Sequence, residues 1–376
     1  MDRQMLFISI NTMTVVVFLM TYYVNKISNN GIIFGVRLPL EFLKEEELIH
    51  LEKSYKRVTL IVYFLMLIIF NFVGYRMGNL SAESAEGFTA IFIVTLLIVS
   101  NVIFIPFYYK TKRLKRERGW SYKKRNVVVT DTSLRKPKKD EKYKVLNSNI
   151  FLVLCIVPII LTLLTILRYS GLPDVINIPN TSFGNFEKRT LKGFIILFQF
   201  PLSQLAMIIL MYFINKIIIS SRVDLNSGAL EAAVIRKKKF RRTGSIMMFA
   251  TTLEMVVMFT FSQLSILYGF NIMLITYIFT AVISLTAFVF IFAFVKIGQG
   301  GRNLQGEEKD ELYKDDDDNW ILGGMYFNKK DPAWMVEKRR GIGWTVNFAN
   351  PKAWLAIGGL VIFIIVNVMI SIAVSK

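Results

Sequence analysis

Residues 89–118 read TAIFIVTLLIVSNVIFIPFYYKTKRLKRER, a run of 21 mostly apolar residues followed by nine residues of which six are basic. An α-helix rises about 1.5 Å per residue, so the apolar run is long enough to cross about 30 Å of hydrocarbon. The basic residues that follow are attracted to anionic headgroups by about 1 kcal/mol each. The stretch therefore predicts a transmembrane helix that ends at the cytoplasmic surface of a membrane.

Seven further runs of this kind predict seven further spans, at 5–24, 58–75, 150–167, 193–217, 245–268, 273–295 and 353–374. If 110–149 is cytoplasmic, the loops on that side of the membrane hold 39 of the 46 Lys and Arg residues. Short cytoplasmic loops carry such an excess of positive charge. The sequence predicts an all-α integral membrane protein with eight transmembrane helices and both termini outside.

Composition excludes several classes of function. The chain is 53% hydrophobic and has a mean hydropathy of +0.46, as expected for a multi-pass membrane protein. A single cysteine, Cys155, and a single histidine, His50, remove most disulfide, metal and Cys/His catalytic chemistry, because such sites need two to four converging partners. We therefore expect no catalytic residues, no metal and no cofactor. The net charge of +19 is explained by a bilayer with anionic headgroups, without nucleic acid as a partner.

Three regions are expected along the chain. Residues 1–296 form a seven-helix membrane domain, 297–352 an acidic linker and a small module, and 353–376 the eighth transmembrane helix. Within the first region, Leu48, Leu51, Tyr55 and Val58 share a helical face, so 38–57 is predicted to be an amphipathic segment on the membrane surface. The basic loop 110–149 is either a headgroup-binding segment or a docking surface for a cytoplasmic partner.

Glu254 is the acidic residue that falls within a predicted span, where a charge costs about 2.5 to 3.5 kcal/mol on insertion scales. Thr251 and Glu254 share a polar face with Ser262 and Ser265. The face is either a ligand or proton site or a set of hydrogen bonds that joins helices. Gln199, Pro201 and Gln204 occupy the preceding span, where the proline predicts a kink or the wall of a cavity.

The last predicted cytoplasmic segment joins an acidic stretch to an aromatic one. Eight of the twelve residues at 307–318 are acidic, giving a net charge of −6, and they form a solvated linker that could face the basic loop 110–149. Beyond it, Trp320, Trp334 and Trp344 alternate with Gly323, Gly324, Gly341 and Gly343. Glycines between aromatic-rich stretches predict a small hairpin-containing module, and 319–351 is a second candidate surface for a cytoplasmic partner.

Two motifs resemble known families. The stretch 320–348 is similar to a C-terminal domain of unknown function found in uncharacterised Gram-positive multi-span proteins, and its candidate site residues are Trp320, Tyr326, Asn328, Asp331, Trp344 and Asn347. The loop 172–180 is distantly similar to a motif of the SdpI-type immunity proteins, through Leu172, Pro173, Ile176 and Pro179. It departs from that motif by an insertion between Ile176 and Pro179 and by the absence of the usual histidine, so no role of that histidine is transferred.

The resemblance implies a non-enzymatic protein in the plasma membrane of a Gram-positive bacterium. Such a protein would bind or sense an envelope-active peptide or lipid, in the manner of an immunity protein. The alternative is a transporter or lipid flippase that uses a polar cavity around Glu254, Gln204 and Pro201.

Overall fold

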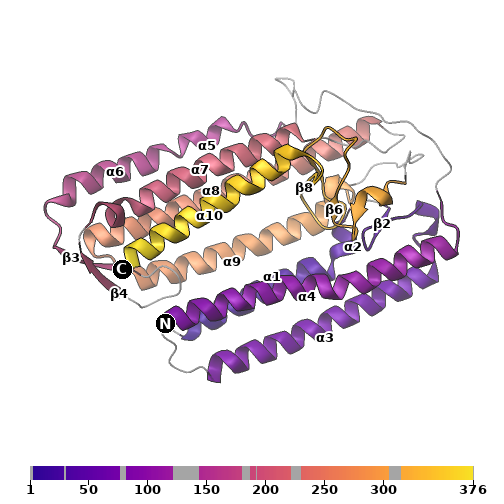
Figure 1. Cartoon of the computed structure of the whole chain (residues 1–376), viewed down its shortest axis with the longest axis horizontal. Helices are drawn as coiled ribbons and strands as arrows, with labels where there is room; N and C mark the ends of the chain where they lie inside the picture. Colours follow the sequence, from indigo (N-terminus) through magenta and orange to yellow (C-terminus); the bar gives the residue numbers. More distant parts are fainter. Residues whose placement is uncertain are drawn as a thin grey trace.

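The computed structural model describes residues 3–28, 31–76, 82–121, 144–179, 187–191, 193–221, 230–304 and 315–375. Long helices run side by side along the molecule (Figure 1). Their bounds are α1 (Arg3–Tyr22), α3 (Glu46–Arg76), α4 (Ala82–Glu117), α6 (Ile156–Tyr169), α7 (Phe194–Ser220), α8 (Leu230–Tyr268), α9 (Ile272–Ile297) and α10 (Pro351–Ser375). The short helix α2 (Val24–Ile27) follows α1, and the short helix α5 (Asn149–Val153) precedes α6.

Six of the described helical segments are long and apolar enough to cross a membrane. They are Glu46–Arg76, Gly87–Glu117, Asn149–Tyr169, Leu197–Ile219, Ala232–Tyr268 and Leu274–Gly301. Two shorter apolar segments, Ile10–Tyr22 and Pro351–Ile362, lie in α1 and α10. Large apolar side chains are exposed along these helices, for example Phe64, Leu97 and Leu163, as expected for surfaces that face lipid. The chain is thus a helical, multi-pass membrane protein.

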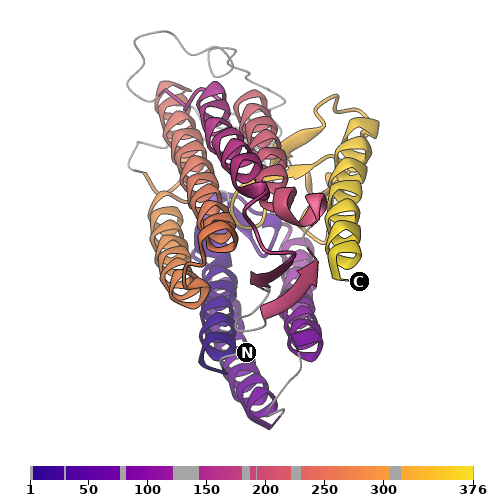
Figure 2. The same cartoon turned by 90° about the vertical axis from the view of Figure 1, so that its left-hand side faces the viewer.

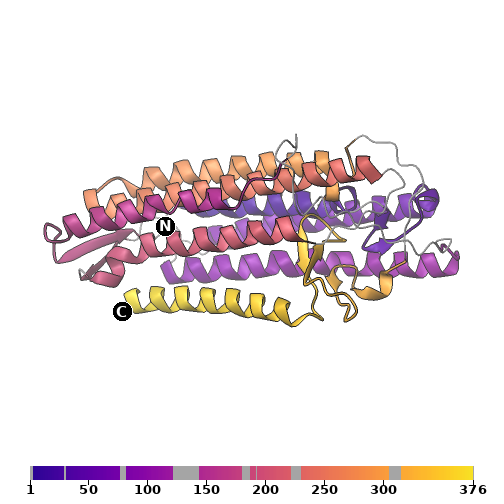
Figure 3. The ribbon, with the colours of Figure 1, turned by 90° about the horizontal axis from the view of Figure 1, so that it is seen from above.

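The short strands divide between the two ends of the bundle. The hairpin of β3 (Val175–Pro179) and β4 (Glu187–Leu191) lies at the end toward which α1 begins and α10 ends (Figures 1 and 3). The other strands gather toward the opposite end (Figure 1): β1 (Ile32–Ile33), β2 (Val36–Arg37), β5 (Trp320–Ile321), β6 (Met325–Tyr326), β7 (Met335–Glu337) and β8 (Trp344–Val346). Seen along the bundle, α10 stands at its margin (Figure 2).

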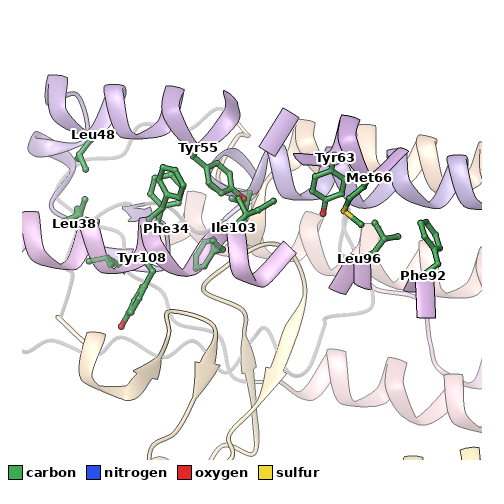
Figure 4. Close-up of a cluster of buried hydrophobic side chains, with 14 of the residues drawn as sticks. Phe34, Leu38, Leu48, Tyr55, Tyr63, Met66, Phe92, Leu96, Ile103 and Tyr108 are labelled. Atoms are coloured by element: carbon green, nitrogen blue, oxygen red, sulfur yellow. The ribbon is translucent and has the colours of Figure 1, made fainter. Parts of the chain in front are cut away.

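The largest hydrophobic core joins α1, α3 and α4 to the β1–β2 hairpin. Phe34 is fully buried in the turn of that hairpin, with its ring centroid 4.9 Å from that of Tyr55 and 5.4 Å from that of Phe107. Figure 4 shows Phe34 and Leu38 beside side chains of α3 and α4. The first loop therefore fills the space between the helices at this end of the bundle, and its apolar residues complete their core.

This packing changes the interpretation of the amphipathic segment 38–57. Its helical part is the start of α3, which continues without a break to Arg76. Leu48 and Tyr55 are buried against protein, because the β1–β2 hairpin supplies the apolar surface that we expected from the membrane. Val58 is exposed, so it does not share the buried face of Leu48 and Tyr55 as predicted.

Candidate functional site

The segment before α10 folds as two hairpins, as the glycine and aromatic pattern predicts. The first joins β5 (Trp320–Ile321) to β6 (Met325–Tyr326), and the second joins β7 (Met335–Glu337) to β8 (Trp344–Val346). Glycines occupy left-handed positions in both turns, including Gly323 at φ 65° and Gly341 at φ 72°. We refer to residues 315–350 as the module.

Asn347 joins the two hairpins of the module. Its side chain is fully buried, and its amide nitrogen donates hydrogen bonds to three backbone carbonyls, those of Asn328 (2.9 Å), Asp331 (3.1 Å) and Ala333 (3.1 Å). Its amide oxygen accepts from the backbone N–H of Asn328 at 3.0 Å. Asp331 in turn accepts from the Tyr326 hydroxyl at 2.9 Å. These five residues therefore form one hydrogen-bonded structural unit.

The aromatic residues of the module divide between two surfaces. Trp320 and Tyr326 pack together with Val336 in a small core, their ring centroids 4.9 Å apart. Trp344 instead packs against α8, where its ring centroid lies 5.4 Å from that of Phe240. Its ring also lies beside Gly244, since a Cβ atom on that glycine would be 3.5 Å from the ring. The module thus has a core of its own and is also docked on the helical bundle.

A network of charged side chains attaches the module to two other parts of the chain. The guanidinium of Arg339 is 1% exposed and forms ion pairs with Asp316 and Asp317. Asp316 also accepts from Arg37 Nε of the first loop at 2.8 Å. Lys115, at the end of α4, contacts Asp315 at 2.7 Å and Asp317 at 2.6 Å. The acidic residues of the module therefore pair with basic residues from three segments: the module itself, the first loop and the end of α4.

The network bears on the predicted acidic linker. Lys115 belongs to the basic loop 110–149, so the described part of the acidic stretch does face that loop. Asp316 and Asp317 are partly buried and paired, which corrects the expectation of a solvated linker at these two positions. Residues 122–143 of the basic loop and 305–314 of the acidic stretch lie outside the described residues.

The electrostatics of Asp316 reflect two opposed effects. Burial raises the pKa of this carboxyl, but the charges of Arg37 and Arg339 and hydrogen bonds from Arg37 and Trp320 lower it more. The resulting pKa lies below the ordinary value of an aspartate. Asp316 is therefore held in its charged form as a bridge between the first loop and the module.

The backbone of the first loop also lies directly against the backbone of the module. A Cβ atom on Gly35 would lie 2.7 Å from the Cα atom of Gly323, and both glycines have positive φ. Arg339 Nη1 donates to the Gly35 carbonyl at 3.2 Å, and the Arg37 N–H donates to Asp317 at 3.0 Å. The β1–β2 hairpin thus lies with its apolar residues in the helical core and its turn against the module.

The module is also bound to the segment that follows α9. Gln299 is fully buried and exchanges two hydrogen bonds with the backbone of Gly343, at 2.9 Å and 2.8 Å. Arg302 donates to the carbonyls of Asn25 and Ser28 at 3.0 Å and 2.8 Å, and the Ser28 hydroxyl accepts from the Gly341 N–H at 2.9 Å. Sequence analysis did not select Gln299, Arg302 or Ser28, because no local pattern links partners that lie between 44 and 313 positions apart.

The candidates within the membrane do not converge on one site. Glu254 is half-buried and accepts a hydrogen bond from Thr286 of α9. Gln204 of α7 is fully buried and donates to the Val256 carbonyl at 2.9 Å and to the Thr260 hydroxyl at 3.1 Å. Glu254 and Val256 are two residues apart and therefore point to nearly opposite sides of α8. Glu254 faces α9, and Gln204 lies in the α7–α8 interface.

The other intramembrane candidates have local contacts. Thr251 donates to the Met247 carbonyl of its own helix at 3.0 Å, so it does not join Glu254. Pro201 is buried within α7, and Gln199 is half-buried. A cavity lined jointly by Glu254, Gln204 and Pro201 is therefore not the arrangement of these helices.

The predicted extracytoplasmic loop forms the β3–β4 hairpin. Leu172 packs on the cluster of Leu197 and Phe198 at the start of α7, and Pro173 precedes β3. Ile176 and Pro179 lie in β3, in register with Thr190 and Glu187 of β4. Residues 180–186, which connect the strands, lie outside the described residues.

Comparison with known proteins identifies one part of the chain. Residues 329–354 match a domain described as a family of unknown function (DUF5808). This range covers the β7–β8 hairpin and the start of α10, and it includes Asp331, Trp344 and Asn347. No curated protein and no solved structure is detectably similar to the chain.

Proposed function

We propose that this is a non-enzymatic plasma-membrane protein that binds or senses an envelope-active peptide or lipid and reports binding through its module. In this proposal the bundle has eight spans with both termini outside, and the module lies in the cytoplasm. The excess of Lys and Arg in alternate loops supports that orientation. The β3–β4 hairpin and the module, which lie at opposite ends of the bundle, would then face opposite sides of the membrane.

The observation that carries the proposal is the position of the β1–β2 hairpin. Phe34 is fully buried between α3 and α4, whereas Gly35 and Arg37, next to it in the chain, contact the module. A ligand that changes the packing of α3 against α4 would displace Phe34, since close-packed cores respond to small changes in shape. The displacement would be passed to the module through two residues of the same short hairpin.

The likeness of the loop 172–180 to the SdpI-type immunity proteins supports the ligand class. Proteins of that type protect a bacterium against a secreted toxic peptide, and the corresponding loop is extracytoplasmic in the proposed topology. A peptide or lipid that acts on the envelope would meet this loop before it reaches the bundle. The presence of the domain of unknown function at 329–354 is compatible with such a role for the module.

Transport or lipid flipping is the second candidate. It is favoured by Gln204 and Gln263, which are fully buried yet keep amide oxygens without a hydrogen-bond partner among the described residues. Buried polar atoms of this kind are costly unless water or a polar ligand satisfies them. The separation of Glu254 from Gln204 argues against one continuous polar path, so we place transport second.

Survival and translocation assays separate the two functions. A strain lacking the gene is challenged with a panel of peptide antibiotics, and the wild-type gene is restored alongside Gly35→Ala and Gly341→Ala variants. Sensing predicts that wild type and Gly341→Ala restore survival and that Gly35→Ala does not, because a Cβ atom on Gly35 would clash with Gly323 of the module, whereas one on Gly341 meets nothing within 4 Å. Unchanged survival in the deletion strain, or peptide and lipid translocation by vesicles that contain the purified protein, would overturn the proposal.

A further inference from the structure

Arg340 has an unusual environment for a cation. Its guanidinium carbon lies 3.5 Å from the ring centroid of Phe104, and its nitrogens donate to Asn101 Oδ1 at 3.1 Å and to the Ser100 carbonyl at 3.4 Å. All three partners are neutral residues of α4. Among the residues that the structure describes, Arg340 has no carboxylate partner, whereas its neighbour Arg339 has two.

The contacts of Arg340 lie within the predicted membrane span of α4, where a cation without a carboxylate partner among the described residues is unusual. Phe104 lies six residues before Lys110, the first residue of the basic run, which is about 9 Å along the helix at about 1.5 Å per residue. Burial lowers the pKa of Arg340, yet a guanidinium stays protonated in proteins. The two neutral acceptors satisfy part of the guanidinium's hydrogen bonding but do not neutralise its charge, so an anion within reach would stabilise it further.

The surface beside Arg340 is open and apolar. Asn101 is exposed on α4, and the large side chains around it on the same helix are exposed as well: Val94, Leu97, Ile98, Val102. Large apolar side chains of α10, including Leu355 and Ile362, are also exposed. An occupant of this place therefore needs an anionic group for Arg340 and apolar chains for the neighbouring helix faces.

We infer that Arg340 forms a binding site for the phosphate of an anionic phospholipid, whose acyl chains lie on the exposed face of α4 at Leu97, Ile98 and Val102. The site faces the inner leaflet in the topology of the proposed function, on which the inference rests for that orientation. A lipid bound there touches both the module and α4. The lipid thereby contributes to the junction through which the bundle and the module are coupled.

Lipid titration of the purified full-length protein in a neutral detergent tests the site. Native mass spectrometry gives the affinity of the first bound phosphatidylglycerol and of the first bound phosphatidylcholine. The wild type should prefer phosphatidylglycerol by about tenfold, the effect of one charge-assisted hydrogen bond. Arg340→Gln should remove this preference, and Arg340→Lys, which keeps the charge, should retain most of it.

Arg116→Gln is the matched control, because it removes one exposed positive charge within the basic run of α4, 12 residues after Phe104. It should leave the preference unchanged. Equal preference in Arg340→Gln and wild type, equal loss in Arg116→Gln, or release of the lipid by inorganic phosphate alone would each overturn the inference. The survival assay is a separate readout: restored survival without a lipid preference overturns only this site, and a lipid preference without a survival effect overturns only the proposed function.

Discussion

Substitution of Gly35 by alanine tests the contact between the first loop and the module, and Gly341→Ala provides a matched control. Both glycines have nearly the same backbone conformation, φ 76° and φ 72°. A residue with a Cβ atom in the left-handed region costs about 1 to 2 kcal/mol, and this cost is shared by the two variants. A Cβ on Gly35 would also lie 2.7 Å from Gly323 Cα, whereas a Cβ on Gly341 meets nothing within 4 Å.

The difference between the two variants therefore isolates the interface. Relief of the clash requires the two backbone turns to separate, which breaks the hydrogen bond from Arg339 to the Gly35 carbonyl. A hydrogen bond from a charged group contributes about 1.5 to 3 kcal/mol, so we expect about 2 kcal/mol of additional destabilisation in Gly35→Ala.

Limited trypsin digestion of the purified protein measures this difference. Lys338, Arg339 and Arg340 are three consecutive cleavage sites, and Arg339 is protected by the packed module. When opening is fast relative to cleavage, the cleavage rate follows the population of the open form. An additional 2 kcal/mol predicts cleavage roughly 30-fold faster in Gly35→Ala than in Gly341→Ala. Equal rates in the two variants would refute the claim that this contact holds the module on the first loop.

Three further outcomes follow from the same contacts. The pKa of Asp316 is lower in the folded protein than in the unfolded chain, so its ion pairs stabilise the module fully above the ordinary aspartate pKa of about 4. This stabilisation is lost as the pH falls through the folded pKa. Tryptophan emission should therefore change below about pH 4 and stay constant between about pH 5 and 8. Asn347→Ala leaves buried backbone groups without partners and should destabilise the module by about 2 to 4 kcal/mol in thermal unfolding. Asn350→Ala removes two exposed hydrogen bonds, one to the Pro332 carbonyl and one from the Lys352 N–H, and should cost about 1 kcal/mol. Equal shifts in the two variants would contradict the role of Asn347. Glu254→Gln can still accept from Thr286 and should alter the free energy of unfolding by less than about 1 kcal/mol, so a larger loss would mean that the charge itself is structural.

Sequence patterns predicted the features of this fold that depend on local chemistry. The apolar runs correspond to long helices, because length and hydrophobicity are sufficient to identify a segment that can cross a bilayer. The glycines at 323 and 341 marked hairpin turns correctly, because positive φ is a property that few other residues tolerate. The resemblance of 320–348 to a domain of unknown function agrees with the family match at 329–354.

The features that sequence analysis missed depend on pairs of residues far apart in the chain. Arg37 and Asp316 are 279 positions apart, and neither position carries a local sign of its partner. The segment 38–57 was expected on the membrane because its apolar face had no visible protein partner, yet the hairpin immediately before it covers that face. The sequence likewise did not show that Gln204 binds the backbone of α8 while Glu254 binds Thr286 of α9, since helical periodicity orders residues on one helix but does not say which neighbour each face meets.

Cysteine labelling in intact cells tests most directly the claim that the β3–β4 end and the module lie on opposite sides of the membrane. Single cysteines replace the exposed residues Asp174, beside β3, and Lys329, in the module, in a Cys155→Ser background. The account predicts that an impermeant thiol reagent modifies the cysteine at 174 in intact cells and modifies that at 329 only after the cells are permeabilised. Modification at 329 in intact cells would contradict the topology, and with it the proposal that the module reports on events outside the cell.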